Sequence, residues 1–520
     1  MSELMLPPLI SSLLKPSVYD HPTTSIRCLE THISWIILTG PYAYKIKKPV
    51  NLGFLDFSTL DKRHFYCWEE LRLNRRLAPQ LYLAVVAITG DPSSPRIGGG
   101  GQILEYAVKM RQFNRHHLLA ALAERGELTE THLEVLAEKI ARFHQSVPQA
   151  TARDPYGDPK QIQESVRQNF AQIDCSEPES LFLLTELAAW SEEQFSALEA
   201  DIAERKHQGF IRECHGDLPL GNIVLWQGSV LPFDCIEFNP TLRWIDTICE
   251  IAFTVMDLSA HGLRPLGFGF LNSYLGLTGD YSGVRLLTYY LVYRAMVRAK
   301  IAYLTSRQHP QETSHLEGFQ RYLRLAKALS QGHKPFLCIT YGFSGSGKSY
   351  LSRQLASFLG ALHLRSDLER KRLAGLEATA RTHAPIAGGI YRPDFTERTY
   401  QKLEEEACAI LTSGFPAIVD ATFLKRAHRQ RFYRLAENLR LPFLILEFQA
   451  EEEILRERVQ QRLRHGRDPS EASLEVLDHQ LTHYDPLDTW EQALCVVFDT
   501  SRETPLEERL AIIKARLGLK

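Results

Sequence analysis

Gly342-Phe343-Ser344-Gly345-Ser346-Gly347-Lys348-Ser349 is the stretch that decides the fold of this 520-residue chain. It is a complete G-x-x-x-x-G-K-[ST] pattern, in which backbone N–H groups and a helix N-terminus surround phosphate oxygens. The apolar run 336–340 before it predicts a buried strand, and the apolar spacing of 350–359 after it predicts a helix. A phosphate-binding loop requires this strand–loop–helix context, so the sequence predicts a site for a nucleoside triphosphate.

The residues of this loop have different expected roles. The backbone that wraps the phosphates is predicted to come from Gly342, Ser344, Gly345, Ser346 and Gly347. Lys348 is expected to reach the β- and γ-phosphates and to act in catalysis, while the Ser349 hydroxyl is expected to bind Mg²⁺. ATP and Mg²⁺ are therefore the predicted cofactors.

Composition narrows the class of protein. Hydrophobic residues make up 44% of the chain, which is enough for real cores, and the length predicts two or three domains. The net charge of −2 argues against non-specific coating of nucleic acid. The nine cysteines are scattered and never spaced C-x-x-C, which favours reduced thiols without a zinc site. With a poor signal peptide and no apolar run of about 18 residues, we expect a cytoplasmic protein without a membrane partner.

The C-terminal third alternates between strand and helix patterns. Strands are predicted at 336–340, 361–365, 415–419, 442–448 and 494–498, and helices between them at 397–413, 426–438 and 451–464. This alternation predicts an α/β domain with a mostly parallel sheet. The polar segment 331–335 before the first strand is the best boundary, which divides the chain into domains 1–330 and 331–520.

The N-terminal region has a different pattern. Strands are predicted at 25–30, 33–38, 42–46, 81–89 and 102–110, with one helix at about 60–77 and mostly helical stretches at 116–205 and 245–330. An antiparallel sheet with one helix, followed by helices, is an α+β plan. The glycine run 98–101 is interpreted as a hairpin turn between the last two strands.

Polar residues after the C-terminal strands suit phosphoryl transfer. Asp367 is predicted to take the proton of an acceptor hydroxyl or to hold that hydroxyl in line, and Arg370 to bind an anionic part of the acceptor. Asp420 would hold Mg²⁺ through water or contact the acceptor. For both aspartates a helix cap is the structural alternative. Arg458 and Arg462 share a helix face and suit a lid over the phosphates, with a solvated basic face as the alternative.

On these residues, the stretch 336–484 resembles the small P-loop kinases: the gluconate-kinase-like enzymes, the polynucleotide 5′-kinase group and the zeta-toxin group. The resemblance implies phosphoryl transfer to a hydroxyl, with Asp367 as base or acceptor anchor. It does not choose among sugar, nucleic-acid and other acceptors.

A second set of residues occurs near the middle of the chain. His215-Gly216-Asp217 leads to Asn222 with the spacing of the H-R-D-x-x-x-x-N catalytic loop, with glycine in place of arginine, and Asp234 follows twelve residues later. This chemistry requires one carboxylate, Asp217, for the proton of the hydroxyl, and the pair Asn222 and Asp234 for Mg²⁺.

A lysine and a glutamate upstream complete this set. Lys45 on the third predicted strand is expected to bind the phosphates, with Glu70 on the following helix as its ion-pair partner. Lys47 points to the same face of that strand and stays an alternative. Thr31-His32 stands where a glycine-rich phosphate-covering loop would separate the first two strands.

Residues 25–300 together resemble the aminoglycoside phosphotransferase family, whose motif is His-Gly-Asp-x-x-x-x-Asn. The resemblance implies a protein-kinase-like fold with Asp217 as base, Asn222 and Asp234 as Mg²⁺ ligands and Lys45 as the phosphate-binding lysine. The whole chain is similar to bacterial bifunctional proteins that fuse such a domain to a P-loop kinase domain.

Three functions follow from these patterns. The first is a phosphotransferase with two ATP sites that acts on hydroxyl groups of small molecules. In the second, the C-terminal domain is a polynucleotide or nucleotide 5′-kinase, for which local positive charge comes from Arg365, Arg370, Lys371, Arg372, Lys425, Arg426, Arg429 and Arg431. In the third, the N-terminal half is a nucleotide-binding pseudokinase that regulates its neighbour.

Overall fold

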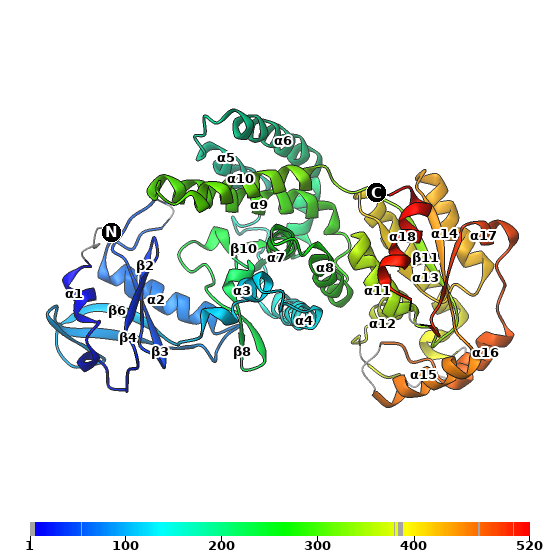
Figure 1. Cartoon of the computed structure of the whole chain (residues 1–520), viewed down its shortest axis with the longest axis horizontal. Helices are drawn as coiled ribbons and strands as arrows, with labels where there is room; N and C mark the ends of the chain where they lie inside the picture. The colour runs from blue at the N-terminus through cyan, green and yellow to red at the C-terminus, as the bar shows by residue number, and fades with distance from the viewer. Residues whose placement is uncertain are drawn as a thin grey trace. The chain divides into compact units, whose positions relative to one another are not determined.

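The computed structural model describes residues 6–53, 55–378, 380–382, 388–465, 469–502 and 504–519 (Figure 1). Its packing divides the chain into two compact units. The first comprises Met1–Leu128, Arg142–Gln161 and Ala203–Thr254, and the second Thr129–Ala141, Ile162–Ile202 and Val255–Lys520. Within the described residues, every helix is too short or too polar to span a lipid bilayer.

A six-stranded antiparallel sheet organises the first unit. Its strands are β1 (Arg27–Glu30), β2 (Ser34–Leu38), β3 (Tyr42–Lys47), β4 (Tyr82–Asp91), β5 (Ser94–Ile97) and β6 (Ile103–Arg111), in the order β1-β2-β3-β6-β4-β5. Helix α2 (Leu60–Asn74) begins at Thr59, whose hydroxyl accepts a hydrogen bond from the Lys62 N–H. This N-cap satisfies one of the free amides of the first turn.

The two faces of this sheet are covered by different elements, because successive side chains of a strand point to opposite sides. Buried residues on the α2 side include Ala43, Cys67, Leu71, Val108 and Met110. On the other side Tyr44 and Ile46 of β3 pack against the N-terminal segment, which contains α1 (Pro8–Ser12) and η1 (Pro16–Val18). Lys45 and Lys47 therefore both face α2.

Short strands and 3₁₀-helices follow in the same unit and carry the loops that contain His215–Asn222 and Asp234. They are β7 (Ile211–Glu213), η3 (Leu220–Asn222), β8 (Ile223–Trp226), β9 (Ser229–Pro232), η4 (Pro240–Leu242) and β10 (Trp244–Asp246). β8 and β9 form an antiparallel hairpin, and β7 pairs with β10. The predicted α+β plan of the N-terminal region is confirmed.

The remaining N-terminal elements are helical, as predicted. They are η2 (Arg115–His117), α3 (Leu119–Glu124), α4 (Glu130–Ser146), α5 (Pro159–Ala171), α6 (Pro178–His207), α7 (Thr247–Ala260), α8 (Arg264–Thr278), α9 (Val284–Gln308) and α10 (Thr313–Ser330). The predicted boundary between residues 330 and 331 falls between the end of α10 and the first strand of the parallel sheet. The stretch 255–330 nevertheless packs in the second compact unit.

A five-stranded parallel sheet forms the centre of the second unit. Its strands are β11 (Leu337–Tyr341), β12 (Leu362–Arg365), β13 (Ala417–Asp420), β14 (Phe443–Gln449) and β15 (Cys495–Asp499), in the order β12-β13-β11-β14-β15. The helices are α11 (Lys348–Leu359), α12 (Ser366–Leu373), α13 (Pro393–Thr412), α14 (Arg426–Asn438), α15 (Glu452–His465), α16 (Leu474–Thr482), α17 (Thr489–Ala493) and α18 (Leu506–Leu517), with η5 at Gly389–Tyr391. The predicted α/β class is confirmed.

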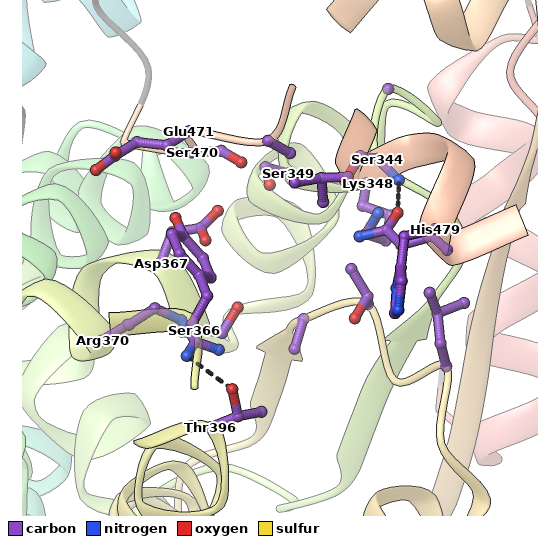
Figure 2. A pocket seen from close by; sticks show the side chains of 18 of the residues that line it. Ser344, Lys348, Ser349, Ser366, Asp367, Arg370, Thr396, Ser470, Glu471 and His479 are labelled. Atoms are coloured by element: carbon purple, nitrogen blue, oxygen red, sulfur yellow. Dashed lines mark hydrogen bonds between the residues drawn. The ribbon is translucent and has the colours of Figure 1, made fainter. Parts of the chain in front are cut away.

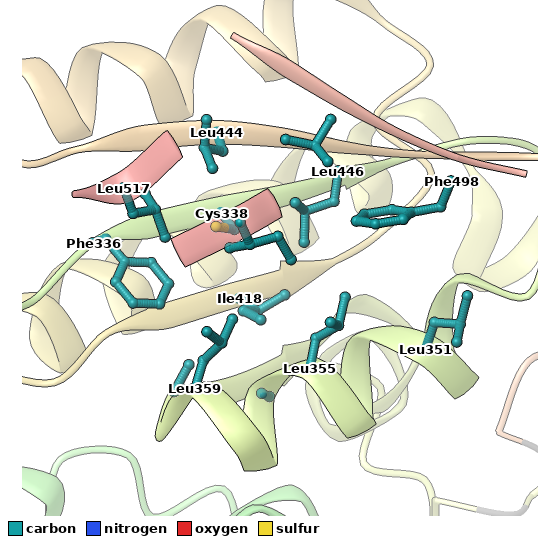
Figure 3. Packing of buried hydrophobic residues seen from close by; sticks show 14 of the residues in the cluster. Phe336, Cys338, Leu351, Leu355, Leu359, Ile418, Leu444, Leu446, Phe498 and Leu517 are labelled. Atoms are coloured by element: carbon teal, nitrogen blue, oxygen red, sulfur yellow. The ribbon is translucent and has the colours of Figure 1, made fainter. Parts of the chain in front are cut away.

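One face of the parallel sheet packs against α11 and α18 (Figure 3). Leu351, Leu355 and Leu359 lie one helical turn apart on α11 and contact the sheet residues Cys338 and Ile418. α13 and α14 contact strands of the same sheet. Burial of this apolar surface fixes β11 and α11 on either side of the phosphate-binding loop.

The structure corrects one turn. β5 was not predicted, because the short sequence Ser94-Pro95-Arg96-Ile97 contains a proline. It forms a hairpin with β4, so the glycine run 98–101 does not join β4 to β6 directly, but leads from β5 back across β4 to β6. Proline is tolerated there because β5 lies at the edge of the sheet.

Candidate active sites

Lys45 lies at the centre of the N-terminal site. Its ammonium nitrogen is 2.9 Å from Glu70 Oε1 on α2 and 2.5 Å from Asp234 Oδ1. Burial by itself lowers the pKa of Lys45, but the two carboxylates raise it well above its usual value. The lysine is therefore charged, and it joins the sheet to the segment after β9.

A second lysine extends this arrangement into a chain of buried charges. Lys47 Nζ is 2.8 Å from Glu70 Oε2 and also contacts Glu237. Lys47 has no exposed side-chain surface, whereas 44% of the Asp234 side chain is exposed. Burial alone raises the pKa of Glu70, yet the two ammonium groups lower it to about 2. Lys45, rather than Lys47, contacts the accessible carboxylate.

Replacing Glu70 with glutamine is expected to destabilise the first unit. The change removes the carboxylate that the ammonium groups of Lys45 and Lys47 share. Removing one partner of a comparable buried ion pair lowers the free energy of unfolding by about 3–5 kcal/mol. Urea unfolding followed by circular dichroism measures the effect, with exposed Glu124→Gln as the control. A loss below about 1 kcal/mol would show that the chain of charges is not a coupled network.

The catalytic-loop residues come together as their spacing predicts. Asn222 Nδ2 donates to Asp217 Oδ2 at 2.8 Å and to the Asp217 carbonyl at 3.1 Å. The His215 side chain is buried, and its Nε2 lies 2.9 Å from the carbonyl of Phe233, next to Asp234. Burial lowers the pKa of His215, so the neutral ring donates to that carbonyl through Nε2. These contacts hold Asn222 against Asp217 and join the residue before Asp234 to the same loop.

A buried carboxylate that was not predicted supports the same loop. Glu250 on α7 accepts hydrogen bonds from the backbone N–H groups of His215 at 2.7 Å and Gly216 at 2.9 Å. Gly216 has φ +89°, and a Cβ there would lie 2.7 Å from the Leu242 carbonyl oxygen. The departure from arginine in this motif therefore has a steric cause. The lone glutamate in the apolar helix α7 was the signal that could have revealed Glu250.

Two backbone features bear on phosphate binding in the N-terminal site. Asp234 has φ +64°, in the left-handed region that non-glycine residues rarely adopt. Such strain often marks a functional position. The turn between β1 and β2 is tight, with Thr31 N–H bonded to the Ser34 carbonyl, and it contains no glycine. Phosphate binding in this site would thus rest on the lysine and the metal ligands.

The phosphate-binding loop connects β11 to α11 in the second unit. Gly345 has φ +86°, and a Cβ there would lie 2.5 Å from the Leu455 carbonyl oxygen, so only glycine fits. Lys348 Nζ donates to the Phe343 carbonyl at 2.7 Å. Burial lowers the pKa of Lys348 to about 8, while Asp420 and Asp367 oppose this shift and Arg462 adds to it. Carboxylates and a guanidinium therefore surround the lysine.

The lowered pKa of Lys348 predicts how nucleotide binding depends on pH. The ammonium form, which attracts the triphosphate, predominates below about pH 8. Above that pH, binding requires proton uptake, so ATP affinity is expected to fall by up to about tenfold per pH unit. Calorimetry between pH 7 and pH 9.5 measures this slope. Lys348→Arg keeps its charge and should flatten it; equal slopes in both proteins would contradict the assignment.

Asp420 ends β13 beside the loop. Burial alone raises its pKa, but His363, Arg365 and a hydrogen bond from Ser349 lower it to about 2. His363 Nε2 lies 3.5 Å from Asp420 Oδ2 and 2.9 Å from the Ser352 hydroxyl. A serine hydroxyl and a carboxylate are hard oxygen donors of the kind that Mg²⁺ prefers. Asp420 does not begin a helix, so the cap alternative does not apply.

One cavity of about 1250 Å³ brings the C-terminal candidates together. Figure 2 shows Asp367 of α12 on one side of it and Lys348 and Ser349 of the loop on the other. The cavity lining also includes Arg370, Asp420, Arg458 and Arg462. α12 has Arg365 as its N-cap and no side-chain cap bond, so Asp367 does not cap the helix.

Three arginines of this cavity donate hydrogen bonds to nearby backbone and hydroxyl groups. Arg370 donates to the Ile390 carbonyl at 2.8 Å and to the Thr396 hydroxyl at 3.1 Å, but its buried Nε has no partner among the described residues. Arg458 donates to Thr500 Oγ1 at 2.9 Å and to the Thr500 carbonyl at 2.7 Å. Arg462 donates to the Ala472 carbonyl at 3.1 Å. Arg458 and Arg462 of α15 thus line the cavity rather than forming a solvated face.

Known proteins resemble this chain in sequence and in structure. Residues 337–487 match the AAA_33 family, described as an AAA domain. Uncharacterized protein Rv2004c of Mycobacterium tuberculosis is 32% identical over 408 residues, which cover 78% of this chain and 80% of that protein. A gluconokinase from Sinorhizobium meliloti has 22% identity and a TM-score of 0.25, covering 36% of this chain and 93% of its own. A choline/ethanolamine kinase family protein from Mesorhizobium loti has 11% identity and a TM-score of 0.39, with coverages of 68% and 98%.

Fold and site together define a chain with two folds: an α+β fold built on an antiparallel sheet, followed by an α/β domain with a phosphate-binding loop. The mycobacterial relative is matched over most of both chains, across both folds. The chain belongs to the family of that protein.

Proposed function

We propose that this chain is an ATP-dependent phosphotransferase with two nucleotide sites, each of which transfers the γ-phosphoryl group to a hydroxyl of a small molecule in the cytoplasm. The observation that carries the proposal is the C-terminal cavity, where Lys348 and Ser349 face Asp367. A lysine for the phosphates, an oxygen donor for a metal and a carboxylate for the hydroxyl are the parts that phosphoryl transfer needs.

In the C-terminal site, Asp367 would hold the acceptor hydroxyl in line and receive its proton. Ser349 and Asp420 would hold Mg²⁺, which neutralises charge on the phosphate oxygens when bound. The hydrogen bond between these two residues favours the metal role of Asp420 over acceptor contact. Arg458 and Arg462 would stabilise charge on the transferred group.

In the N-terminal site, Asp217 would be the base and Lys45 the phosphate ligand. Asn222 uses its amide nitrogen to hold Asp217, so its amide oxygen is the atom that would bind Mg²⁺ together with Asp234. The direct contact of Lys45 with Asp234 supports a role for both at one triphosphate. The pseudokinase alternative is motivated by the glycine-free turn between β1 and β2.

The small-molecule acceptor is favoured by the pairing of the basic residues near the cavity. Arg429 and Lys371 are almost completely buried, and Arg429 is bonded to Glu491. Arg426 and Arg431 contact Asp488 and Glu397. These residues do not present the free positive surface that a nucleic-acid strand requires. The buried Nε of Arg370 supports an acceptor that carries an anionic group.

An acceptor screen tests the proposal. ADP release by the full chain is measured with sugars, amino alcohols, nucleosides and oligonucleotides, each compared with the Asp217→Asn and Asp367→Asn variants. Small molecules should stimulate ADP release at both sites with little dependence on salt. Stimulation by oligonucleotides alone, falling steeply with salt, would instead assign a 5′-kinase.

A further inference from the structure

Helix α8 is almost entirely apolar, yet it carries a buried asparagine. Only 7% of Asn272 is exposed. Its Nδ2 donates to the Ala361 carbonyl at 3.0 Å, and its Oδ1 accepts from the His363 N–H at 2.9 Å. A buried amide must satisfy its hydrogen bonds, and Asn272 does so with the backbone on both sides of Leu362.

This contact lies on the outer edge of the parallel sheet. β12 is an edge strand, and its paired side runs along β13 from Leu362 to Arg365. The N–H and C=O groups on an unpaired edge need other partners when they are buried. Asn272 supplies one donor and one acceptor there, as a neighbouring strand would.

The C-terminal end of α8 contacts the helix that follows β12. Arg372 of α12 donates to the Gly276 carbonyl at 2.7 Å. A Cβ on Gly276 would lie 3.2 Å from Leu368 Cδ1, and one on Gly279 would lie 2.5 Å from Arg372 Nε. The small residues of α8 and its C-cap therefore let α12 approach closely.

The contacts that Asn272 and Gly276 make fall on either side of Ser366-Asp367 in the sequence. Asn272 holds residues 361 and 363 before it, and Gly276 holds Arg372 after it. We infer that α8 is a positioning element of the C-terminal site and that Asn272 is a positioning residue for Asp367. The inference rests on the proposed phosphotransfer at this site. It means that the segment 331–520 lacks a part of its own active-site support.

A displaced carboxylate should affect the chemical step more than nucleotide binding. Phosphoryl transfer requires the acceptor hydroxyl in line, and an error of about 1 Å costs on the order of 100-fold in rate. Lys348 and Ser349 begin α11, against which α8 also packs, but the hydrogen bonds of Asn272 go to the backbone of residues 361 and 363. The loss of Asn272 should therefore lower kcat and leave the KM for ATP nearly unchanged.

The test compares Asn272→Ala with Ser273→Ala in the full chain. Among the described residues, the Ser273 hydroxyl donates to the Gly269 carbonyl of its own helix and to no other group, so its variant is a matched control. Both carry Asp217→Asn so that only the C-terminal site turns over. We expect Asn272→Ala to lower kcat about tenfold or more with the KM for ATP within about twofold. An unchanged kcat, or an equal change in the control, would overturn the inference.

Hydrogen–deuterium exchange provides a second readout that needs no acceptor. Exchange of the peptide 361–367 should rise about tenfold or more in Asn272→Ala and stay unchanged in Ser273→Ala. If the alanine variant does not fold, Asn272→Asp is used in its place, because it keeps an acceptor for the His363 N–H. Equal exchange in all variants would overturn the positioning role. If Lys348→Ala does not lower ADP release in the Asp217→Asn background, the proposed function of the C-terminal site fails, whereas the exchange result still decides about α8.

Discussion

Lys348→Ala is expected to lower phosphoryl transfer at the C-terminal site by about 10³-fold, since it removes a positive charge from a water-poor site where charge develops in the transition state. The lysine is 9% exposed, and Lys425 is the other lysine among the described residues that line the cavity. ADP release in the Asp217→Asn background measures the effect without a contribution from the other site.

Lys334→Ala is the control for this variant, because Lys334 is exposed and precedes the first strand of the sheet. It should retain the wild-type rate. A Lys348→Ala protein with more than about a tenth of wild-type activity would show that the loop does not bind the reacting phosphates.

The second large effect is expected for Asp217→Asn. This change keeps the shape of the side chain and removes the group that takes the proton, which is worth about 10²–10⁴-fold in general base catalysis. The bond from Asn222 can persist through the amide oxygen, so ATP affinity should stay within about threefold. Turnover is measured in the Lys348→Ala background, where only the N-terminal site contributes.

Asp91→Asn, on the exposed end of β4, is the matched control. It should leave turnover unchanged. If Asp217→Asn also leaves it unchanged, or if the Lys348→Ala background shows no turnover with any acceptor, the N-terminal fold is a regulatory nucleotide-binding domain rather than a second enzyme.

Local sequence patterns predicted most of the fold because they report local physics. The alternation of apolar strands with amphipathic helices predicted all five strands of the parallel sheet to within two residues. The phosphate-binding loop was predictable since its glycines, lysine and serine are adjacent in the chain. A site whose residues are adjacent in the sequence can be predicted without knowledge of the tertiary fold.

The rest depends on long-range contacts. Lys45 and Lys47 share a strand face, so sequence period could not choose between them; the choice depends on Asp234 and Glu237, about 190 residues away. Glu250 supports the catalytic loop from another helix, and Asn272 reaches an edge strand about 90 residues downstream. Each is a polar residue among apolar ones. Such a pattern predicts that the residue has a buried partner, but it does not predict which residue that partner is.

The proposed function requires two ATP sites on one chain. Calorimetric titration of the full chain with a non-hydrolysable ATP analogue and Mg²⁺ tests it most directly. We expect a stoichiometry of two for the wild type and one for Lys348→Ala. A wild-type chain that takes up no nucleotide, or a stoichiometry that Lys348→Ala leaves unchanged, would contradict it.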